Sequence, residues 1–384
     1  MQLIVDSGQL PVGWEIKKLV EVCQVEKSQG IYTNLPYVGM ENIESNTARF
    51  IGSTQPQSVK SSTFKFSHKH ILYGRLRPYL NKLLAPNFEG HCSTEIFPIK
   101  PSEYLDRHFL LYWFLMDSTV KRINATCTGA RMPRANINAV FEFDFLLPSL
   151  PEQKRIVAIL DEAFEGIDSA IANTEKNLTN SRELFENYLQ NLDAEKESLG
   201  NLVDIRTGKL DANAATEDGQ YPFFTCSREI YKIDSFAFDC EAILLAGNNA
   251  VGDFNVKHYK GQFNAYQRTY VITVNTEKKI LYRYLYFQML KSLKEFKLQS
   301  VGAGTKFLKL GMIQDLRIAL PTIEKQQEII STLDKLKAET QRLETIYRQK
   351  LAALKELKQS ILQKAFTGEL TADTSKTVKE EIAA

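Results

Sequence analysis

The chain has 384 residues, of which 43% are hydrophobic and 24% charged, and its formal net charge is +2. This length predicts two or three domains, and this composition excludes collagen-like, mucin-like and largely disordered chains. The longest fully apolar run, residues 109–116, is far shorter than the roughly 18 residues of a membrane-spanning helix. We therefore expect no membrane association. Because the net charge is close to zero, any nucleic-acid-binding surface must be local.

The N-terminus and the cysteines predict a cytoplasmic protein. The first residues lack the basic-then-apolar pattern of a secretory signal. The five cysteines are scattered and contain no C-x-x-C pair. Such a set favours reduced thiols over a disulfide framework or a zinc site.

A repeat at an offset of 173 residues runs through more than 60 positions. It places residues 148–153 on residues 321–326 and pairs Asp161 with Asp334. An unbroken offset of this length is hard to obtain by chance, so the chain contains two copies of one structural unit. The order along the chain is variable, repeated, variable, repeated.

The repeated segments predict long helices of about 40 residues, or roughly 60 Å. No proline lies between Glu152 and Leu192, and apolar or small residues recur in both copies at steps of three and four. The predicted seam runs from Ile156 and Leu160 in the first copy and reaches Leu357 and Ile361 in the second. This is the pattern of a coiled coil, and the second copy ends near Gly368, a residue type that commonly ends helices. The alternative is that each helix packs only on its own domain. The narrow stripe favours an antiparallel pair, because a sheet requires a wider apolar face.

The variable segments carry short β-rich runs broken by Gly, Asn and Pro, and each also holds an apolar helical patch. The predicted fold class is α+β (mixed α/β), with two globular domains separated by two long antiparallel coiled-coil helices in a pseudo-two-fold internal repeat. The charged connector at 193–198 is compatible with helix, so we expect it to continue the first helix and to set the spacing of the domains. The predicted boundaries are a first domain at 1–147, the first repeated helix with its connector at 148–198, a second domain at 199–320, the second repeated helix at 321–370 and a disordered tail at 371–384.

The sequence contains no recognisable catalytic motif. Residues 247–253 have the glycine spacing of a phosphate loop but lack the Lys-Ser/Thr that follows it, so we expect a strand-to-strand loop. No dinucleotide-binding glycine pattern, base-methyltransferase run or nuclease-like carboxylate–lysine spacing is present. His68 and His70 are only two histidines and do not make a metal site. We expect no catalytic residue, metal or cofactor in this chain.

Cations, amides and aromatic side chains gather in loops of both variable segments. Arginine and lysine suit the guanine acceptors of the DNA major groove, and asparagine and glutamine suit adenine. The candidate DNA-binding residues are Arg75, Arg77, Tyr79, Asn81, Lys82, Arg131 and Arg134 in the first segment, and Asn248, Asn249, Lys257, His258, Gln267, Arg268, Thr305 and Lys306 in the second. The alternative is a set of solvated loops with a few structural arginines. Clustering in two segments of the same organisation favours DNA binding.

Six stretches have characteristic sequences: the helix openings at 147–156 and 320–326, the ending at 359–370, and residues 71–79, 92–95 and 264–270 of the variable segments. Through these stretches the chain resembles, over its whole length, the DNA-specificity subunits of type I restriction-modification systems. One departure is Lys325, because the family usually has an acidic residue directly before the glutamine. That departure concerns the helix cap.

This resemblance implies that each variable segment is a target recognition domain reading one half of a bipartite DNA target. It implies that double-stranded DNA, two methyltransferase (modification) subunits and restriction/translocase subunits are the partners. S-adenosylmethionine, ATP and magnesium would be bound by those partners, which would methylate adenine or cleave, while this chain would be non-catalytic. Two rivals remain. A coiled-coil adaptor or scaffold that binds proteins explains the helices but not the polar loops, and a fused restriction-modification enzyme is disfavoured by the missing catalytic motifs.

Overall fold

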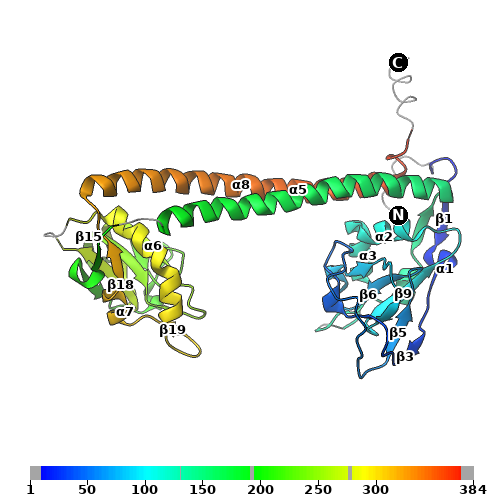
Figure 1. The fold of residues 1–384 in the computed structure, drawn as a ribbon, viewed down its shortest axis with the longest axis horizontal. Coiled ribbons are helices and arrows are strands. Elements are labelled where there is room, and N and C mark those ends of the chain that lie inside the picture. Colours follow the sequence, from blue (N-terminus) through cyan, green and yellow to red (C-terminus); the bar gives the residue numbers. More distant parts are fainter. Residues whose placement is uncertain (1–9, 130, 191–193, 276–278, 373–384) are drawn as a thin grey trace, which may run out of the picture. The chain divides into compact units, whose positions relative to one another are not determined.

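The structure is a computed structural model that describes residues 10–129, 131–190, 194–275 and 279–372. The chain divides into two compact units (Figure 1). The first unit comprises the residues up to 173 and those from 349 onward, and the second comprises residues 174–348. Each unit therefore contains one globular domain and part of each long helix. The predicted disordered tail lies outside the described residues from 373 onward.

The globular domain of the first unit is built from short strands and helices. Its elements are β1 (Glu15–Lys18), α1 (Leu19–Val22), β2 (Cys23–Val25), β3 (Gln29–Gly30), β4 (Tyr37–Val38), β5 (Thr63–Phe66), β6 (Ile71–Gly74), β7 (Leu83–Leu84), β8 (Gly90–Cys92), β9 (Ile96–Pro101), α2 (Arg107–Leu115), α3 (Asp117–Ala125), α4 (Ile137–Phe141) and β10 (Asp144–Leu147). Two four-stranded sheets, ordered β2-β9-β6-β7 and β3-β5-β8-β4, form its body. Helix α2 is buried from Phe109 to Leu115, as expected of a helix that is apolar all round.

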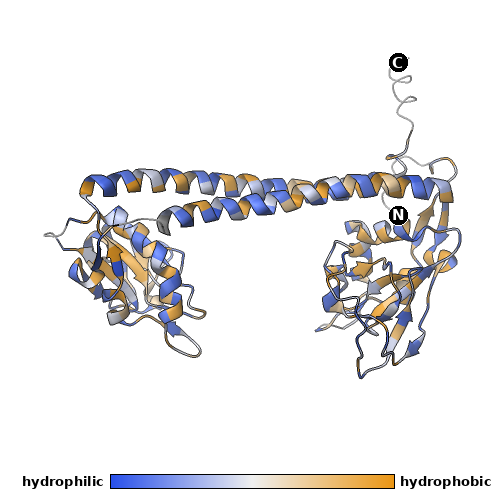
Figure 2. Ribbon diagram, in the orientation of Figure 1, coloured by the Kyte–Doolittle hydropathy of each residue, from blue (hydrophilic) through white to orange (hydrophobic). Residues whose placement is uncertain are grey.

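The globular domain of the second unit contains one larger sheet. Its elements are β11 (Lys196–Ser198), β12 (Val203–Thr207), β13 (Tyr221–Phe224), β14 (Tyr231–Ile233), β15 (Phe238–Ala246), β16 (Asn248–Asn249), β17 (Val256–Ala265), β18 (Thr269–Val274), α6 (Tyr282–Gln299), β19 (Lys306–Phe307), α7 (Leu310–Gln314) and β20 (Arg317–Ala319). The six-stranded sheet has the order β12-β18-β15-β17-β13-β14. Figure 2 shows apolar residues concentrated along its strands, and β15 is fully buried from Ala242 to Ala246, as the continuous apolar run of a central strand predicts.

An antiparallel strand pair closes each domain where it joins its long helix. In the first unit β1 pairs with β10, and in the second β11 pairs with β20. The prediction that the connector continues the first helix is therefore wrong for residues 196–198, which form β11. The Leu320 amide also donates to the Glu195 carbonyl oxygen (2.9 Å). Pairing with β20 satisfies these backbone groups, which outweighs the weak helix propensity of a short charged segment.

The two long helices, α5 (Leu150–Gln190) and α8 (Ile323–Thr367), pack antiparallel within each unit. In the first unit, Lys358 Nζ lies 2.9 Å from Asp168 Oδ1. In the second, Arg182 Nε lies 2.6 Å from Glu344 Oε1. As the partner number rises along one helix it falls along the other, which confirms the predicted antiparallel pair. None of the helices in the described ranges has the combined length and apolarity that crossing a bilayer requires.

The buried stripe of α8 departs from the predicted heptad near its end. Leu357 was expected in the seam but is 47% exposed, whereas Leu362 is fully buried. The reason is a second packing surface, because the Gln359 side chain bonds to the Leu115 carbonyl oxygen (3.1 Å) and the Asp117 amide (2.8 Å). Here α8 packs on the α2–α3 junction as well as on α5, so its buried face turns.

Two equivalent glutamines, Gln153 and Gln326, attach the domains to the long helices. We call them the anchor glutamines, and both are fully buried. Gln153 Oε1 accepts from the Asp106 amide (2.7 Å), and Nε2 donates to the carbonyl oxygens of Tyr104 (2.9 Å) and Pro148 (2.8 Å). Asp106 is the N-cap of α2. The side chain thus ties the start of α2 to the first turn of α5.

The second unit repeats this attachment. Gln326 Oε1 accepts from the amide of Leu281, the N-cap of α6, and Nε2 donates to the carbonyl oxygens of Lys279 and Pro321, each at 2.9 Å. A second contact follows eight residues later on each long helix. Tyr112 Oη donates to Asp161 in the first unit, and Arg283 Nε donates to Asp334 Oδ1 (3.0 Å) in the second. Each domain is therefore held to its helix at two points.

Candidate nucleic-acid interface

In the first unit, the loop that follows β6 lies against residues 133–135. The Arg77 amide donates to the Pro133 carbonyl oxygen (2.7 Å), and the Ala135 amide donates to that of Arg75 (2.9 Å). Leu76 and Arg134 form an isolated antiparallel bridge between these contacts. We call this meeting of loops the first crossing. It brings Arg75, Arg77 and Arg134 together, as a shared DNA-binding surface requires.

A carboxylate lies at the centre of the first crossing. Arg75 Nε donates to Glu95 Oε2 (3.0 Å), while Arg134 donates from Nη2 (2.8 Å) and Nε (3.0 Å) to Oε1. The hydrogen bonds from Arg134, followed by those from Arg75, hold the pKa of the Glu95 carboxyl below its usual range against the opposing effect of burial. The Arg75 guanidinium also lies over the Phe97 ring, 5.2 Å from its centroid. Glu95 is thus an ionised partner of both arginines.

The remaining candidates of the first unit divide into exposed and internally bonded residues. Arg77 and Arg131 are exposed, and Tyr79 is 52% exposed on the 3₁₀ turn Pro78–Leu80. Asn81 is only 2% exposed and donates from Nδ2 to the Phe114 carbonyl oxygen (3.2 Å). Lys82 Nζ donates to the Met40 carbonyl oxygen (2.7 Å). Asn81 and Lys82 therefore support the turn that presents Arg77 and Tyr79.

The second unit contains a corresponding crossing. Strand β16 pairs with β19, which places Asn248 opposite Phe307 and Asn249 opposite Lys306, next to Thr305. The Gly247 amide donates to the Arg268 carbonyl oxygen (2.9 Å), and the Arg268 guanidinium lies 5.1 Å from the centroid of the Phe307 ring. We call this the second crossing. It brings together Asn248, Asn249, Arg268, Thr305 and Lys306 at one edge of the domain.

Three further candidates of the second unit lie outside this crossing. Gln267 is exposed beside it and donates to Asp211 Oδ1. Lys257 Nζ donates to the carbonyl oxygen of Ser227 and to Asn255 Oδ1, both at 2.6 Å, and burial lowers its pKa. His258 lies 2.9 Å from Glu241 and stacks on Tyr282 of α6 (interplanar angle 3°). The structure therefore does not place His258 with the loop residues.

The two crossings occupy equivalent places in the repeat. Thr128 bridges Arg134 as Val301 bridges Phe307, and the Ala135 bond to Arg75 matches the Leu308 bond to Gly247. The Ser93–Val38 and Tyr266–Phe224 backbone bonds match as well. By these bonds Glu95 corresponds to Arg268, Arg134 to Phe307 and Arg75 to Gly247. One backbone frame therefore carries two different sets of side chains.

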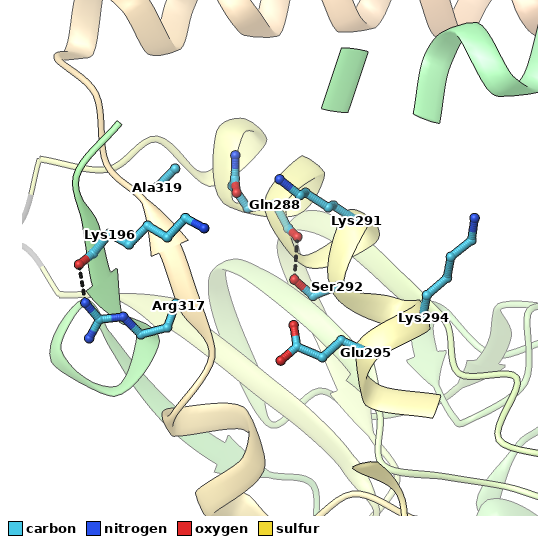
Figure 3. A pocket seen from close by; sticks show the side chains of 8 residues that line it. All are labelled: Lys196, Gln288, Lys291, Ser292, Lys294, Glu295, Arg317 and Ala319. Atoms are coloured by element: carbon cyan, nitrogen blue, oxygen red, sulfur yellow. Dashed lines mark hydrogen bonds between the residues drawn. The ribbon is translucent and has the colours of Figure 1, made fainter. Parts of the chain in front are cut away.

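Figure 3 shows a separate cavity of about 540 Å³ in the second unit, between α6 and the β11–β20 pair. The side chains that line it are those of Lys196, Gln288, Lys291, Ser292, Lys294, Glu295, Arg317 and Ala319. Several of its cations are held within the chain. Lys294 lies 2.5 Å from Glu186, and Arg317 Nη2 donates to the Lys196 carbonyl oxygen (2.6 Å). Glu295 adds a carboxylate to the lining. None of these lining residues belongs to the second crossing, so the cavity is separate from the candidate interface.

The residues at 247–253 form the expected strand-to-strand loop. The loop runs from the end of β15 through β16 towards β17. Asn249 Oδ1 accepts from the amides of Val251 (2.9 Å) and Asp253 (3.0 Å) and so shapes the turn. No group of three or more metal-ligating side chains occurs among the residues that the structure describes.

Sequence reasoning missed Glu95 as a member of the candidate interface. It lies in the stretch 92–95, which carried part of the resemblance, but its partners are 20 and 39 residues away. The offset of 173 contained one signal, since it places Glu95 on the candidate Arg268. A charge reversal at equivalent positions marks a place where the two domains differ in chemistry.

Comparison with known proteins gives a consistent result along the chain. A family model described as the type I restriction modification DNA specificity domain matches residues 11–180 and 191–353. The type I restriction enzyme EcoDI specificity subunit from Escherichia coli is 43% identical over 176 residues, which cover 45% of this chain and 38% of that protein. The StySPI specificity subunit from Salmonella potsdam is 24% identical over an aligned length of 430 residues. That alignment covers 96% of this chain and 91% of that protein.

Two solved structures share the fold. One is a chain solved in work on complex assembly and conformational transition of the type I R-M system. It has a TM-score of 0.77 and 21% identity, and the match covers 94% of this chain and 100% of that one. The other is the HsdS subunit from Thermoanaerobacter tengcongensis, with a TM-score of 0.55, 19% identity and coverage of 94% and 98%. With the family model matched on both halves of the repeat, the chain belongs to the family of type I restriction-modification DNA specificity domains.

Proposed function

We propose that this chain is a DNA-specificity subunit that reads a bipartite target, with one half read by each unit. The observation that carries the proposal is the pair of equivalent crossings, each of which gathers cations or amides just beyond the end of a central strand. Cations there can position phosphates, and arginine and asparagine side chains can read base edges. Because the two crossings carry different side chains, the two halves of the target differ in sequence.

The partners of this function are two copies of a modification subunit and the restriction/translocase subunits. Leu184 of α5 and Leu357 of α8 support two-fold docking, because they lie 173 residues apart in the repeat and are 60% and 47% exposed. S-adenosylmethionine, ATP and magnesium are bound by the partners, which methylate adenine or cleave the DNA. This chain supplies recognition and no catalytic group, and it functions in the cytoplasm.

The test is selection from a library of random duplexes, using the full chain together with type I modification subunits. We expect enrichment of two short motifs separated by a gap of constant length. Arg77→Ala should weaken the first motif and Arg268→Ala the second, each by about 1–3 kcal/mol of binding free energy. Arg342→Ala is the matched control, because Arg342 is exposed on α8 and pairs with Glu339 on the same helix. A library that yields no enriched motif contradicts the proposal.

A methylation assay separates recognition from catalysis. The purified chain with S-adenosylmethionine and the enriched duplex should transfer no methyl group, and adding modification subunits should produce methylation of that duplex. Methyl transfer by the chain alone would instead support the fused enzyme. Binding of modification subunits without any enrichment of DNA would support the adaptor.

A further inference from the structure

Glu95 accepts hydrogen bonds from two arginines of the first crossing, with both its side chain and its backbone. Its carboxylate accepts the three hydrogen bonds described above, plus a fourth from Arg134 Nε to Oε2 (3.1 Å). Its carbonyl oxygen accepts from the Arg75 amide (2.9 Å). The side chains of Arg75, Glu95 and Arg134 are 34%, 24% and 37% exposed. The trio is therefore ordered by internal contacts yet remains within reach of a ligand.

The trio retains hydrogen-bond donors. Among the described residues, no acceptor bonds to the two terminal nitrogens of Arg75, whose Nε is used by Glu95. Arg134 uses Nε and Nη2 on Glu95, and within the described part of the chain its Nη1 makes only a long contact with the Met132 carbonyl oxygen (3.4 Å). These donors are held in place before DNA arrives. A guanidinium fixed in advance loses less side-chain entropy on binding.

The second crossing shows that the backbone frame forms without a carboxylate. Arg268 stands at the place of Glu95, with Phe307 and Gly247 at the places of Arg134 and Arg75. The same backbone bonds are present. The net charge of the three side chains is +1 in both crossings, since two arginines and one glutamate are replaced by one arginine. Glu95 is therefore dispensable for the frame and distinguishes the chemistry of the two crossings.

From these contacts we infer that Glu95 is a positioning residue for DNA specificity, which fixes Arg75 and Arg134 for base reading and limits the positive charge of the first crossing. This inference rests on the proposed function. It predicts two effects of opposite direction for one substitution. Removing the charge of Glu95 releases the arginines, so discrimination between DNA sequences falls. The same change adds one positive charge beside the phosphates, so binding to unrelated DNA strengthens.

The experiment measures binding of the full chain with modification subunits to three duplexes by fluorescence anisotropy. The probes are the enriched duplex, one with its first half scrambled and one with its second half scrambled. For Glu95→Gln we expect the discrimination of the first half to fall about tenfold or more, while that of the second half is unchanged. Affinity for DNA scrambled in its first half should rise, with a salt dependence steeper by about 0.9.

The matched control is Glu142→Gln, which removes the same charge in the same unit from an exposed carboxylate paired with Lys18. It should leave the discrimination of both halves unchanged. Unaltered discrimination in Glu95→Gln overturns the inference. Loss of affinity for all three duplexes with a lowered melting temperature also overturns it, because that result indicates a purely structural role. If the parent protein enriches no duplex, the proposed function fails instead.

A second variant tests the inference independently of Glu95→Gln. Combining Arg75→Gly, Glu95→Arg and Arg134→Phe transfers the side chains of the second crossing into the first and keeps the net charge. We expect this variant to fold, to lose discrimination of the first half and to keep that of the second. Retention of the parental first-half preference would show that the trio does not set specificity.

Discussion

Replacement of the anchor Gln326 by glutamate should destabilise the second unit in a pH-dependent way. The side chain is fully buried, and its Nε2 donates to two carbonyl oxygens. An ionised carboxylate of the same shape would face both oxygens without a proton, so the introduced carboxyl must take up a proton when the chain folds. Holding a carboxyl protonated at pH 7 costs about 1.36 kcal/mol for each unit above its pKa of about 4.3, or roughly 4 kcal/mol.

The protonated form still leaves one carbonyl oxygen without its donor, which costs about 1–3 kcal/mol. The free energy of unfolding should therefore fall by about 5 kcal/mol at pH 7. Burial raises the folded pKa of such a carboxyl above its unfolded value, so the penalty grows as pH rises and shrinks as pH falls. At pH 5 the protonation cost is only about 1 kcal/mol.

The assay is thermal unfolding of the full chain at pH 7 and pH 5, with Gln341→Glu as the matched control. Gln341 is exposed on the same helix, so its replacement makes the same charge change without burial. At about 2–4 °C for each kcal/mol in a unit of this size, the melting temperature of Gln326→Glu should lie roughly 10–20 °C below the control at pH 7. Equal melting temperatures, or a deficit that does not shrink at pH 5, would refute the role of the anchor.

Four residues inserted immediately before Glu195 should leave the gap between the half-sites unchanged, because the β11–β20 pair fixes the domain to α8; a longer gap in methylation maps would show that the connector sets the spacing. Alanine replacement of Arg182 and Glu344, singly and together, should give a coupling free energy of about 0.2–1 kcal/mol in urea unfolding, and a value of zero would mean that the pair contributes nothing. Burial raises the pKa of the Cys23 thiol to about 12, so iodoacetamide at pH 8 should modify it only after denaturation; rapid modification of the folded chain would contradict its burial. The hydrogen bond from Arg134 lowers the pKa of Glu95, so its contribution to the unfolding free energy is present at neutral pH and lost as pH falls through the folded pKa. Glu95→Gln should accordingly flatten the acid limb of the stability curve, and an unchanged limb would exclude that contribution.

The repeat and its helical stripe could be read from the sequence because they depend on local periodicity. Ile156 and Leu160, both in the predicted seam, are fully buried. The position of Leu357 could not be read, because a tertiary contact on the α2–α3 junction turns the buried face there. The strand at 196–198 was missed for a related reason, since its partner β20 lies more than a hundred residues away in the chain.

The candidate interface was predicted as a set of loops but not as a geometry. Composition identified Arg75 and Arg134, yet only the fold shows that Glu95 joins them. Asn81 and His258 have side chains suited to base reading, but internal partners hold them away from the loop surface. A sequence shows which hydrogen-bonding groups a loop carries, whereas burial and internal pairing decide which of them remain available.

The two-point attachment of each domain has a mechanical consequence. On α8, the contacts from Gln326 and Asp334 are separated by one helical stretch of about 12 Å. A domain held to a helix at one point can rotate about that point. Two contacts this far apart resist tilting of the domain along the helix axis. Force that tilts the domain along the helix, as when DNA is bent against its loops, is therefore carried into α8 as bending. Each domain and the first turns of its long helix therefore tilt together.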